Sequence, residues 1–214
     1  MGVTAKICGL SAEEAVSAAV AGGAAYLGFV FYPPSRRAVT PGEAARLCAA
    51  VPSGVARVGL FVDADDAVLE ATLALAPLDI LQFHGSETPQ RVGEVRLRFR
   101  LPVMKAVAIA GPPDLLGAAR YEDIADLLLF DAKPPRRPDA LPGGNGLAFD
   151  WGLIAERSWR RPWMLSGGLT AELLPEAVRI SGAAAVDVSS GVESRPGFKD
   201  LNKIHDFLAV ARTL

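Results

Sequence analysis

The chain has 214 residues, half of them hydrophobic and 21% charged, with a formal net charge of −2. This composition excludes a disordered chain and supplies enough apolar residues for one sizeable core. No long run of Lys or Arg occurs, and the three Arg-Arg pairs, Arg36-Arg37, Arg136-Arg137 and Arg160-Arg161, are isolated, so we expect solvated loops there and no broad basic face for nucleic acid.

Eight short apolar runs recur along the chain, and each is followed by a stretch with helical spacing. The runs are almost continuously hydrophobic, which is typical of strands buried on both faces of a parallel sheet. In chain order, the predicted strands are residues 3–8, 26–31, 55–61, 80–83, 103–108, 127–130, 163–165 and 184–188.

Capping residues indicate where several helices begin. Ser11 with Glu14, and Thr40 with Glu43, each match the capping-box pattern, and Pro41 suits a first helical position. Each cap predicts a helix that follows its strand. The candidate caps of later helices are Asp63, Ser86 and Thr170.

Residues 15–32 carry no charge over roughly the length of a membrane span. The stretch is mostly alanine and glycine, and Gly22-Gly23 interrupts it. We therefore expect a helix end, a turn and a buried strand there, and no membrane partner.

The alternation of eight strands with eight helices predicts an α/β fold, a single (β/α)8 TIM barrel in which residues 1–214 form one domain. An open doubly wound sheet would favour a GxGxxG turn after its first strand, but the chain has Cys8-Gly9-Leu10-Ser11 there. The longest irregular stretch, residues 132–147, is rich in Pro, Gly and Arg, and a loop this long is more often functional than idle.

Two turns predict a phosphate site. Active sites of such barrels lie at the C-terminal ends of the strands, and phosphate sites are common in the loops after strands seven and eight. Glycines let the backbone approach an anion closely, and helix starts aim free N–H groups at it. Serines can add hydroxyl donors beside such turns. The glycines and serines expected to hold the phosphate after the last two strands are Gly167, Gly168, Ser189, Ser190 and Gly191.

Other polar residues at the strand ends each have two readings. Cys8 could be a catalytic thiol or a small buried hydrophobe, and Asp131 could be a general acid or an anchor for its own loop. Lys6 could be a Schiff-base lysine, with two other lysines as rivals. His84 could line the pocket or satisfy a local hydrogen bond. The residue types alone leave these alternatives open.

The two cysteines, Cys8 and Cys48, are too few for a disulfide scaffold, and no His/Cys cluster has metal-ligand spacing. We therefore expect a reducing, cytoplasmic setting and no metal. Glu13 and Glu14 fall where the apolar part of a signal peptide would run, so we expect no signal peptide.

The segments with the most distinctive sequences are Lys6-Ile7-Cys8-Gly9, Gly28-Phe29-Val30-Phe31, Pro34-Ser35-Arg36-Arg37, Leu81-Gln82-Phe83-His84-Gly85, Asp131, Gly143-Gly144-Asn145-Gly146, Phe149-Asp150-Trp151, Ser166-Gly167-Gly168-Leu169 and Asp187-Val188-Ser189-Ser190-Gly191-Val192-Glu193. Together, in this order and spacing, they resemble the phosphoribosylanthranilate isomerase family over essentially the whole chain. Two departures are Ser166, where the family usually has Ala, and Asn145, where it usually has Thr or Ser.

The resemblance implies an Amadori rearrangement in tryptophan biosynthesis, from N-(5-phosphoribosyl)anthranilate to 1-(2-carboxyphenylamino)-1-deoxyribulose 5-phosphate. It implies that Asp131 is the general acid for the ribose ring oxygen and Cys8 the general base for the C2 proton. No cofactor is expected, because the substrate's own amine is the electron sink. The resemblance implies that Arg37 binds the anthranilate carboxylate. We also expect Lys6, His84 and Gly146 to take part in substrate binding.

A thiol base must lose its proton, so we expect positive charge near Cys8, with Lys6 as the candidate source. The rivals are other sugar-phosphate barrels. A histidine-pathway isomerase would resemble a two-aspartate design, which Cys8 argues against, and an indoleglycerol-phosphate synthase needs a lysine and glutamate set that is not found. A catalytically silent barrel that binds a phosphorylated ligand is the third. In every case we expect a small-molecule partner and a monomer or homodimer.

Overall fold

The computed structural model describes residues 2–134 and 141–214. The predicted solvated pair Arg136-Arg137 lies outside the described residues, as does the middle of the predicted loop 132–147.

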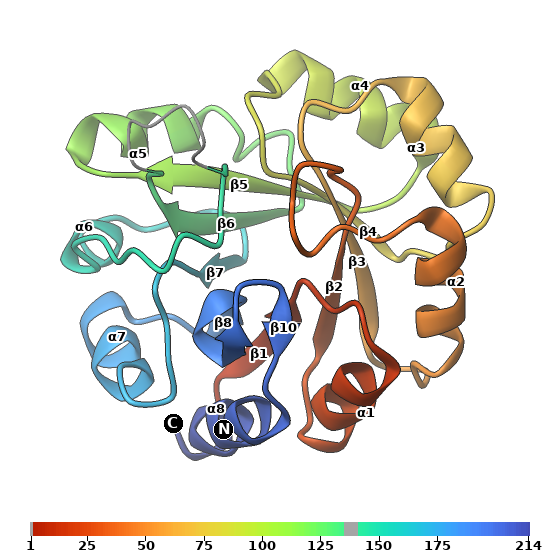
Figure 1. The fold of residues 1–214 in the computed structure, drawn as a ribbon. Helices are drawn as coiled ribbons and strands as arrows, with labels where there is room; N and C mark the ends of the chain where they lie inside the picture. The colour runs from red at the N-terminus through yellow and green to blue at the C-terminus, as the bar shows by residue number, and fades with distance from the viewer. Residues whose placement is uncertain (1, 135–140) are drawn as a thin grey trace.

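Eight parallel strands close into a barrel, in the order in which they occur along the chain (Figure 1). Strand β1 pairs with β2 on one side and with β8 on the other, with Lys6 opposite Tyr26 and Asp187. All eight predicted strands are therefore confirmed, with ends that differ by at most two residues. The strands are β1 Thr4–Cys8, β2 Tyr26–Val30, β3 Ala56–Phe61, β4 Ile80–Phe83, β5 Val103–Ile109, β6 Leu127–Ala132, β7 Trp163–Leu165 and β8 Ala185–Val188.

The helices lie around the outside of the barrel (Figure 1). They are α1 Glu13–Ala21, α2 Pro41–Ala49, α3 Asp66–Leu73, α4 Pro89–Phe99, α5 Pro112–Ala119, α6 Gly152–Ala155, α7 Leu174–Ser181 and α8 Leu201–Thr213. Between β8 and α8, the 3-10 helix η1 Ser190–Val192 leads into a small antiparallel pair, β9 Glu193–Arg195 and β10 Phe198–Lys199.

The uncharged stretch 15–32 contains the end of α1, a turn and β2, as predicted. Among the described residues, none of the helices combines the length and hydropathy that a membrane crossing needs.

The first two predicted caps have different outcomes. Thr40 accepts a hydrogen bond from the Glu43 backbone N–H at 3.2 Å, and the Glu43 carboxylate accepts one from the Thr40 N–H at 2.7 Å, which confirms the capping box of α2. The prediction for Ser11 is wrong. Helix α1 begins one residue later than the pattern implies, so Ala12 is its N-cap and no side chain caps it.

Asp63 and Ser86 are also not helix caps, because they bind each other. The Ser86 N–H donates to the Asp63 carboxylate at 2.8 Å, which ties the loop after β3 to the loop after β4. Asp65 and Thr88, each two residues further along, cap α3 and α4 instead. Thr170 accepts from the Leu173 N–H at 3.4 Å and so stabilises the turn before α7 rather than the first turn of the helix.

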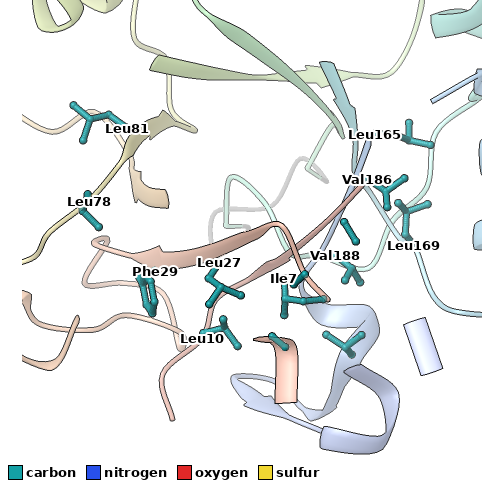
Figure 2. Close-up of a cluster of buried hydrophobic side chains, with 14 of the residues drawn as sticks. Ile7, Leu10, Leu27, Phe29, Leu78, Leu81, Leu165, Leu169, Val186 and Val188 are labelled. Atoms are coloured by element: carbon teal, nitrogen blue, oxygen red, sulfur yellow. The ribbon is translucent and has the colours of Figure 1, made fainter. Parts of the chain in front are cut away.

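Buried apolar side chains of the described residues form three clusters, and the smallest, Cys8, Val30 and Leu60, lies at the cavity described below. The largest cluster lies between the strands and the surrounding helices, and Figure 2 shows its side chains from β1, β2, β7 and β8, among them Ile7, Leu27 and Val186. The residues that alternate with these point into the barrel. The second cluster, which includes Val58 and Met104, fills the barrel interior.

Candidate active site

A cavity opens at the C-terminal ends of the strands. It brings together residues from β1, β6 and the loops after β2, β4, β6, β7 and β8. The predicted site residues that line it are Cys8, Arg37, His84, Asp131, Gly146, Gly167, Gly168, Ser189, Ser190 and Gly191.

Lys6 is the one predicted site residue that does not line the cavity. Its side chain is fully buried inside the barrel, and its ammonium donates to the Asp187 carboxylate at 2.8 Å. The other oxygen of that carboxylate accepts from the Ser166 hydroxyl at 3.1 Å. Residues 6 and 8 share the inward face of β1, so Lys6 supports the cavity floor while Cys8 reaches the cavity.

The Lys6 ammonium lies near the Cys8 thiol, as expected. The pKa of Cys8 is nevertheless raised, whereas a base that is deprotonated when the substrate binds needs a low pKa. Burial raises the pKa of Cys8, and the nearby Lys6 ammonium opposes that rise without cancelling it. Gly28, opposite Cys8 in the β1–β2 pairing, makes room for both groups. A Cβ at position 28 would lie 2.8 Å from the Cys8 sulfur and 3.2 Å from the Lys6 Nζ.

Asp131 lies inside β6, at the cavity wall, and is 6% exposed. One carboxylate oxygen accepts from the Ala132 N–H at 2.8 Å, and the other lies 3.2 Å from the His84 Nε2. On the far side of that imidazole, the Gln82 side-chain nitrogen lies 3.1 Å from Nδ1. When the Gln82 amide donates to Nδ1, the neutral imidazole carries its proton on Nε2 and donates to Asp131.

The sequence predicted a solvated loop at Arg36-Arg37, but the Arg37 side chain is buried, because Glu193 holds it in the cavity wall. Its Nε donates to one carboxylate oxygen at 2.7 Å and its Nη2 to the other at 3.0 Å, a bidentate pair. Burial raises the pKa of Glu193, but the hydrogen bonds from Arg37 and the charge of Lys199 outweigh it and hold that pKa below its ordinary value. One edge of the guanidinium is therefore fixed, and Nη1 lies at the other edge, toward the loop at Gly144.

The turn after β7 has the backbone shape that only glycine adopts easily. Gly167 and Gly168 have φ angles of +89° and +65°. A Cβ on Gly168 would lie 2.8 Å from the Leu147 carbonyl carbon, because the loop before α6 passes directly over the turn. Next to this turn, Ser189, Ser190 and Gly191 line the same part of the cavity at the start of η1.

Two residues that support these groups were missed by the sequence analysis. Glu193 appeared there only as the last letter of a matching segment, and Lys199 did not appear. Lys199 donates to the Ser189 carbonyl at 2.8 Å and to the Glu193 carboxylate at 3.1 Å. Both belong to the β9–β10 pair, whose strands of three and two residues are too short for a hydrophobic period to indicate.

The comparisons with known proteins agree over the whole chain. A family model described as N-(5'phosphoribosyl)anthranilate (PRA) isomerase matches residues 5–210. A protein named N-(5'-phosphoribosyl)anthranilate isomerase from Paracoccus denitrificans (strain Pd 1222) is 59% identical over 99% of this chain and 98% of its own length. One of the same name from Rhodospirillum centenum (strain ATCC 51521 / SW) is 58% identical over 100% of both.

Solved structures give the same result. A crystal structure of phosphoribosyl anthranilate isomerase from Thermotoga maritima superposes with a TM-score of 0.88 at 36% identity, over 99% of this chain and 100% of that one. A second, in complex with reduced 1-(o-carboxyphenylamino)-1-deoxyribulose 5-phosphate, has a TM-score of 0.84 at 34% identity, with the same coverage of both chains.

Proposed function

The chain belongs to the phosphoribosylanthranilate isomerase family, and from that premise we propose that Cys8 and Asp131 catalyse its reaction in the cavity at the strand ends. The reaction is an aldose–ketose isomerisation of tryptophan biosynthesis, which converts N-(5-phosphoribosyl)anthranilate to 1-(2-carboxyphenylamino)-1-deoxyribulose 5-phosphate. The observation that carries the assignment is that one cavity contains a thiol, a carboxyl group, an arginine and two glycine- and serine-rich turns.

The first step opens the ribose ring. Asp131 gives its proton to the ring oxygen as the bond between that oxygen and C1 breaks. The lone pair of the anthranilate nitrogen forms a C=N bond to C1, which leaves a cationic Schiff base. The hydrogen-bond chain through His84 and Gln82 orients the Asp131 carboxyl group for this transfer.

The second step removes the C2 proton. The Cys8 thiolate takes that proton, and the C–H electron pair forms a C1=C2 bond while the nitrogen becomes neutral. Tautomerisation of this enolamine adds a proton at C1 and removes one from O2. The proton that Cys8 gains balances the one that Asp131 loses, and the substrate's nitrogen is the electron sink, so the mechanism needs no cofactor.

The raised pKa of Cys8 favours this order of steps. In the empty cavity, burial favours the neutral thiol. The Schiff-base cation formed by ring opening adds a positive charge in a poorly hydrated site, which favours the thiolate and also acidifies C2. Ring opening therefore comes first, and proton removal follows.

The two anionic groups of the substrate, its carboxylate and its phosphate, bind to different residues of the cavity. The free edge of the Arg37 guanidinium suits the planar anthranilate carboxylate. The phosphate is held by Gly167 and Gly168, whose left-handed backbone allows close approach of an anion, and by Ser189, Ser190 and Gly191 beside them in the cavity wall. His84 and Gly146 line the space between the two ends.

The test is turnover of phosphoribosylanthranilate, followed by loss of its fluorescence. We expect Cys8→Ala and Asp131→Asn each to lower kcat by about 10²- to 10⁴-fold, the usual contribution of one acid or base. Cys48→Ala is the matched control, because Cys48 is the other buried free thiol and lies in α2, outside the cavity. Near-normal turnover in either catalytic variant would remove that residue from its role.

We also propose that the chain works in the cytoplasm on this small molecule, as a monomer or a homodimer. Cys8 and Cys48 are both free thiols, the state that a reducing compartment maintains. Light scattering on the purified protein separates the two oligomeric forms.

A further inference from the structure

Lys199 is a buried lysine whose contacts the mechanism does not use. Its side chain is 3% exposed. Its ammonium donates to the Ser189 carbonyl at 2.8 Å, to the Ser189 hydroxyl at 3.4 Å and to the Glu193 carboxylate at 3.1 Å. One ammonium thus links the turn at the start of η1 to the carboxylate that holds Arg37.

The charges in this cluster do not balance. Arg37 and Lys199 share the single Glu193 carboxylate, and one of its oxygens accepts from both. The pKa of Lys199 is lowered, because burial disfavours its charge more than Glu193 and Cys8 favour it. A buried positive charge of this kind is stabilised by an anion placed close to it. The group nearest to it on the cavity wall is Ser189, one of the proposed phosphate-holding residues.

We propose that Lys199 is a positioning residue of the isomerase, which holds the Ser189-Ser190-Gly191 turn in its anion-binding shape and supplies the positive charge that attracts the substrate's phosphate. Lys199 does not line the cavity, so it acts through Ser189. Because Arg37 keeps two hydrogen bonds to Glu193 without Lys199, the carboxylate end of the site does not depend on this role. The inference rests on the proposed function and deepens it.

The experiment compares Lys199→Met, Lys199→Arg and the wild type. Calorimetric titration measures the affinity for inorganic phosphate and, separately, for anthranilate. We expect Lys199→Met to weaken phosphate binding about tenfold, the scale of one hydrogen bond to a charged group, and to leave anthranilate binding within about twofold. In turnover on the pH plateau, above the rising limb on which the Lys199 charge affects the ionisation of Cys8, KM should rise about tenfold while kcat changes less than about threefold. Lys199→Arg, which keeps the charge and the donors, should restore most of the phosphate affinity.

Lys105→Met is the matched control for loss of a buried lysine. Lys105 is 4% exposed and donates to the buried Glu87 carboxylate at 2.8 Å, at the ends of other strands. We expect it to lower the melting temperature as much as Lys199→Met does, with phosphate affinity within about twofold of the wild type. If Lys199→Met does not fold, Lys199→Gln makes the same comparison.

Two outcomes would overturn the inference. One is unchanged phosphate affinity in the Lys199 variant, and the other is an equal loss in Lys105→Met. The titration needs no turnover, so a wild type that binds phosphate but leaves phosphoribosylanthranilate unchanged would contradict the proposed function alone.

Discussion

Cys8 is a thiol whose surroundings act on its acidity in opposite directions. Burial raises its pKa, the ammonium groups of Lys6 and Lys199 lower it, and the Asp187 carboxylate raises it. The buried Lys6–Asp187 ion pair therefore also affects the pKa of Cys8, because each of its two charges acts on the thiol beside it. With Cys8 as the base that we propose, the balance among these four groups is expected to set the pH range in which the isomerase works.

Changing Lys6 should move that range. A base acts deprotonated, so kcat/KM rises with pH through the pKa of Cys8. Lys6→Met removes a charge that lowers this pKa and leaves Asp187, which raises it, so we expect the rising limb of the profile to shift to higher pH. The double variant Lys6→Met with Asp187→Asn keeps the interior neutral and should shift the limb less, in the same direction. A shift to lower pH in either protein would contradict the account.

Arg37 can be tested against its neighbour in the chain. We expect Arg37→Ala to lower kcat/KM by about a hundredfold, since it removes the planar cation that pairs with the anthranilate carboxylate. Glu193 keeps Lys199 as a partner, so the cavity wall retains part of its structure. Arg36→Ala, at an exposed position on the same loop, should leave kcat/KM near the wild-type value. Equal losses in the two variants would mean that the loop, and not the guanidinium, is what matters.

At the scale of the elements, helix starts were the least predictable feature. Ser11 and Thr40 have the same local pattern, but only Thr40 caps a helix. The pattern does not specify at which residue after the loop the backbone becomes helical. After β1 the N-cap is Ala12, and the helix begins at Glu13. Asp63 was also a plausible cap from its residue type and position. In the structure its carboxylate instead accepts a hydrogen bond from the Ser86 N–H, in the loop after the next strand.

Stability measurements can separate the two capping patterns. We expect Thr40→Ala to lower the free energy of unfolding by about 1 kcal/mol, because it removes the acceptor for the Glu43 N–H. Ser11→Ala should change it by less than about 0.5 kcal/mol, because Ser11 is exposed and α1 has no side-chain cap. Urea titrations of both variants give these differences directly. A loss of similar size in the two would show that Ser11 has a capping role in solution.

The location of the site was predictable because the strand ends determine it, while the roles of its residues stay predictions. Cys8 and Asp131 follow from the rule that barrel chemistry lies at the C-terminal ends of strands, combined with the family resemblance. The supports of the site were not predictable, since Glu193 binds Arg37 across 156 residues of sequence and lies in a strand of three. Lys6 was expected at the substrate, but the inward face of β1 places it one layer deeper, where its ammonium donates to Asp187 and lies beside Cys8.

At the scale of the whole molecule, the closed barrel favours one cooperative unit. Because β1 pairs with both β2 and β8, no consecutive half of the chain can complete the sheet alone. We therefore propose that residues 1–214 form a single domain. We expect far-ultraviolet and near-ultraviolet circular dichroism to give the same midpoint of unfolding in urea. Two separated midpoints would indicate two units with independent cores.

The pairing of the first strand with the last also orders events during synthesis. Lys6 and Asp187 are 181 residues apart, and a ribosome adds about 5–20 residues per second, so Lys6 leaves the ribosome roughly 10 to 40 seconds before its partner. During that interval its ammonium is hydrated in an open, incomplete sheet. The nascent chain therefore contains the Cys8 thiol early but can complete the cavity around it only when β8 arrives, and the same event removes Lys6 and Asp187 from water together.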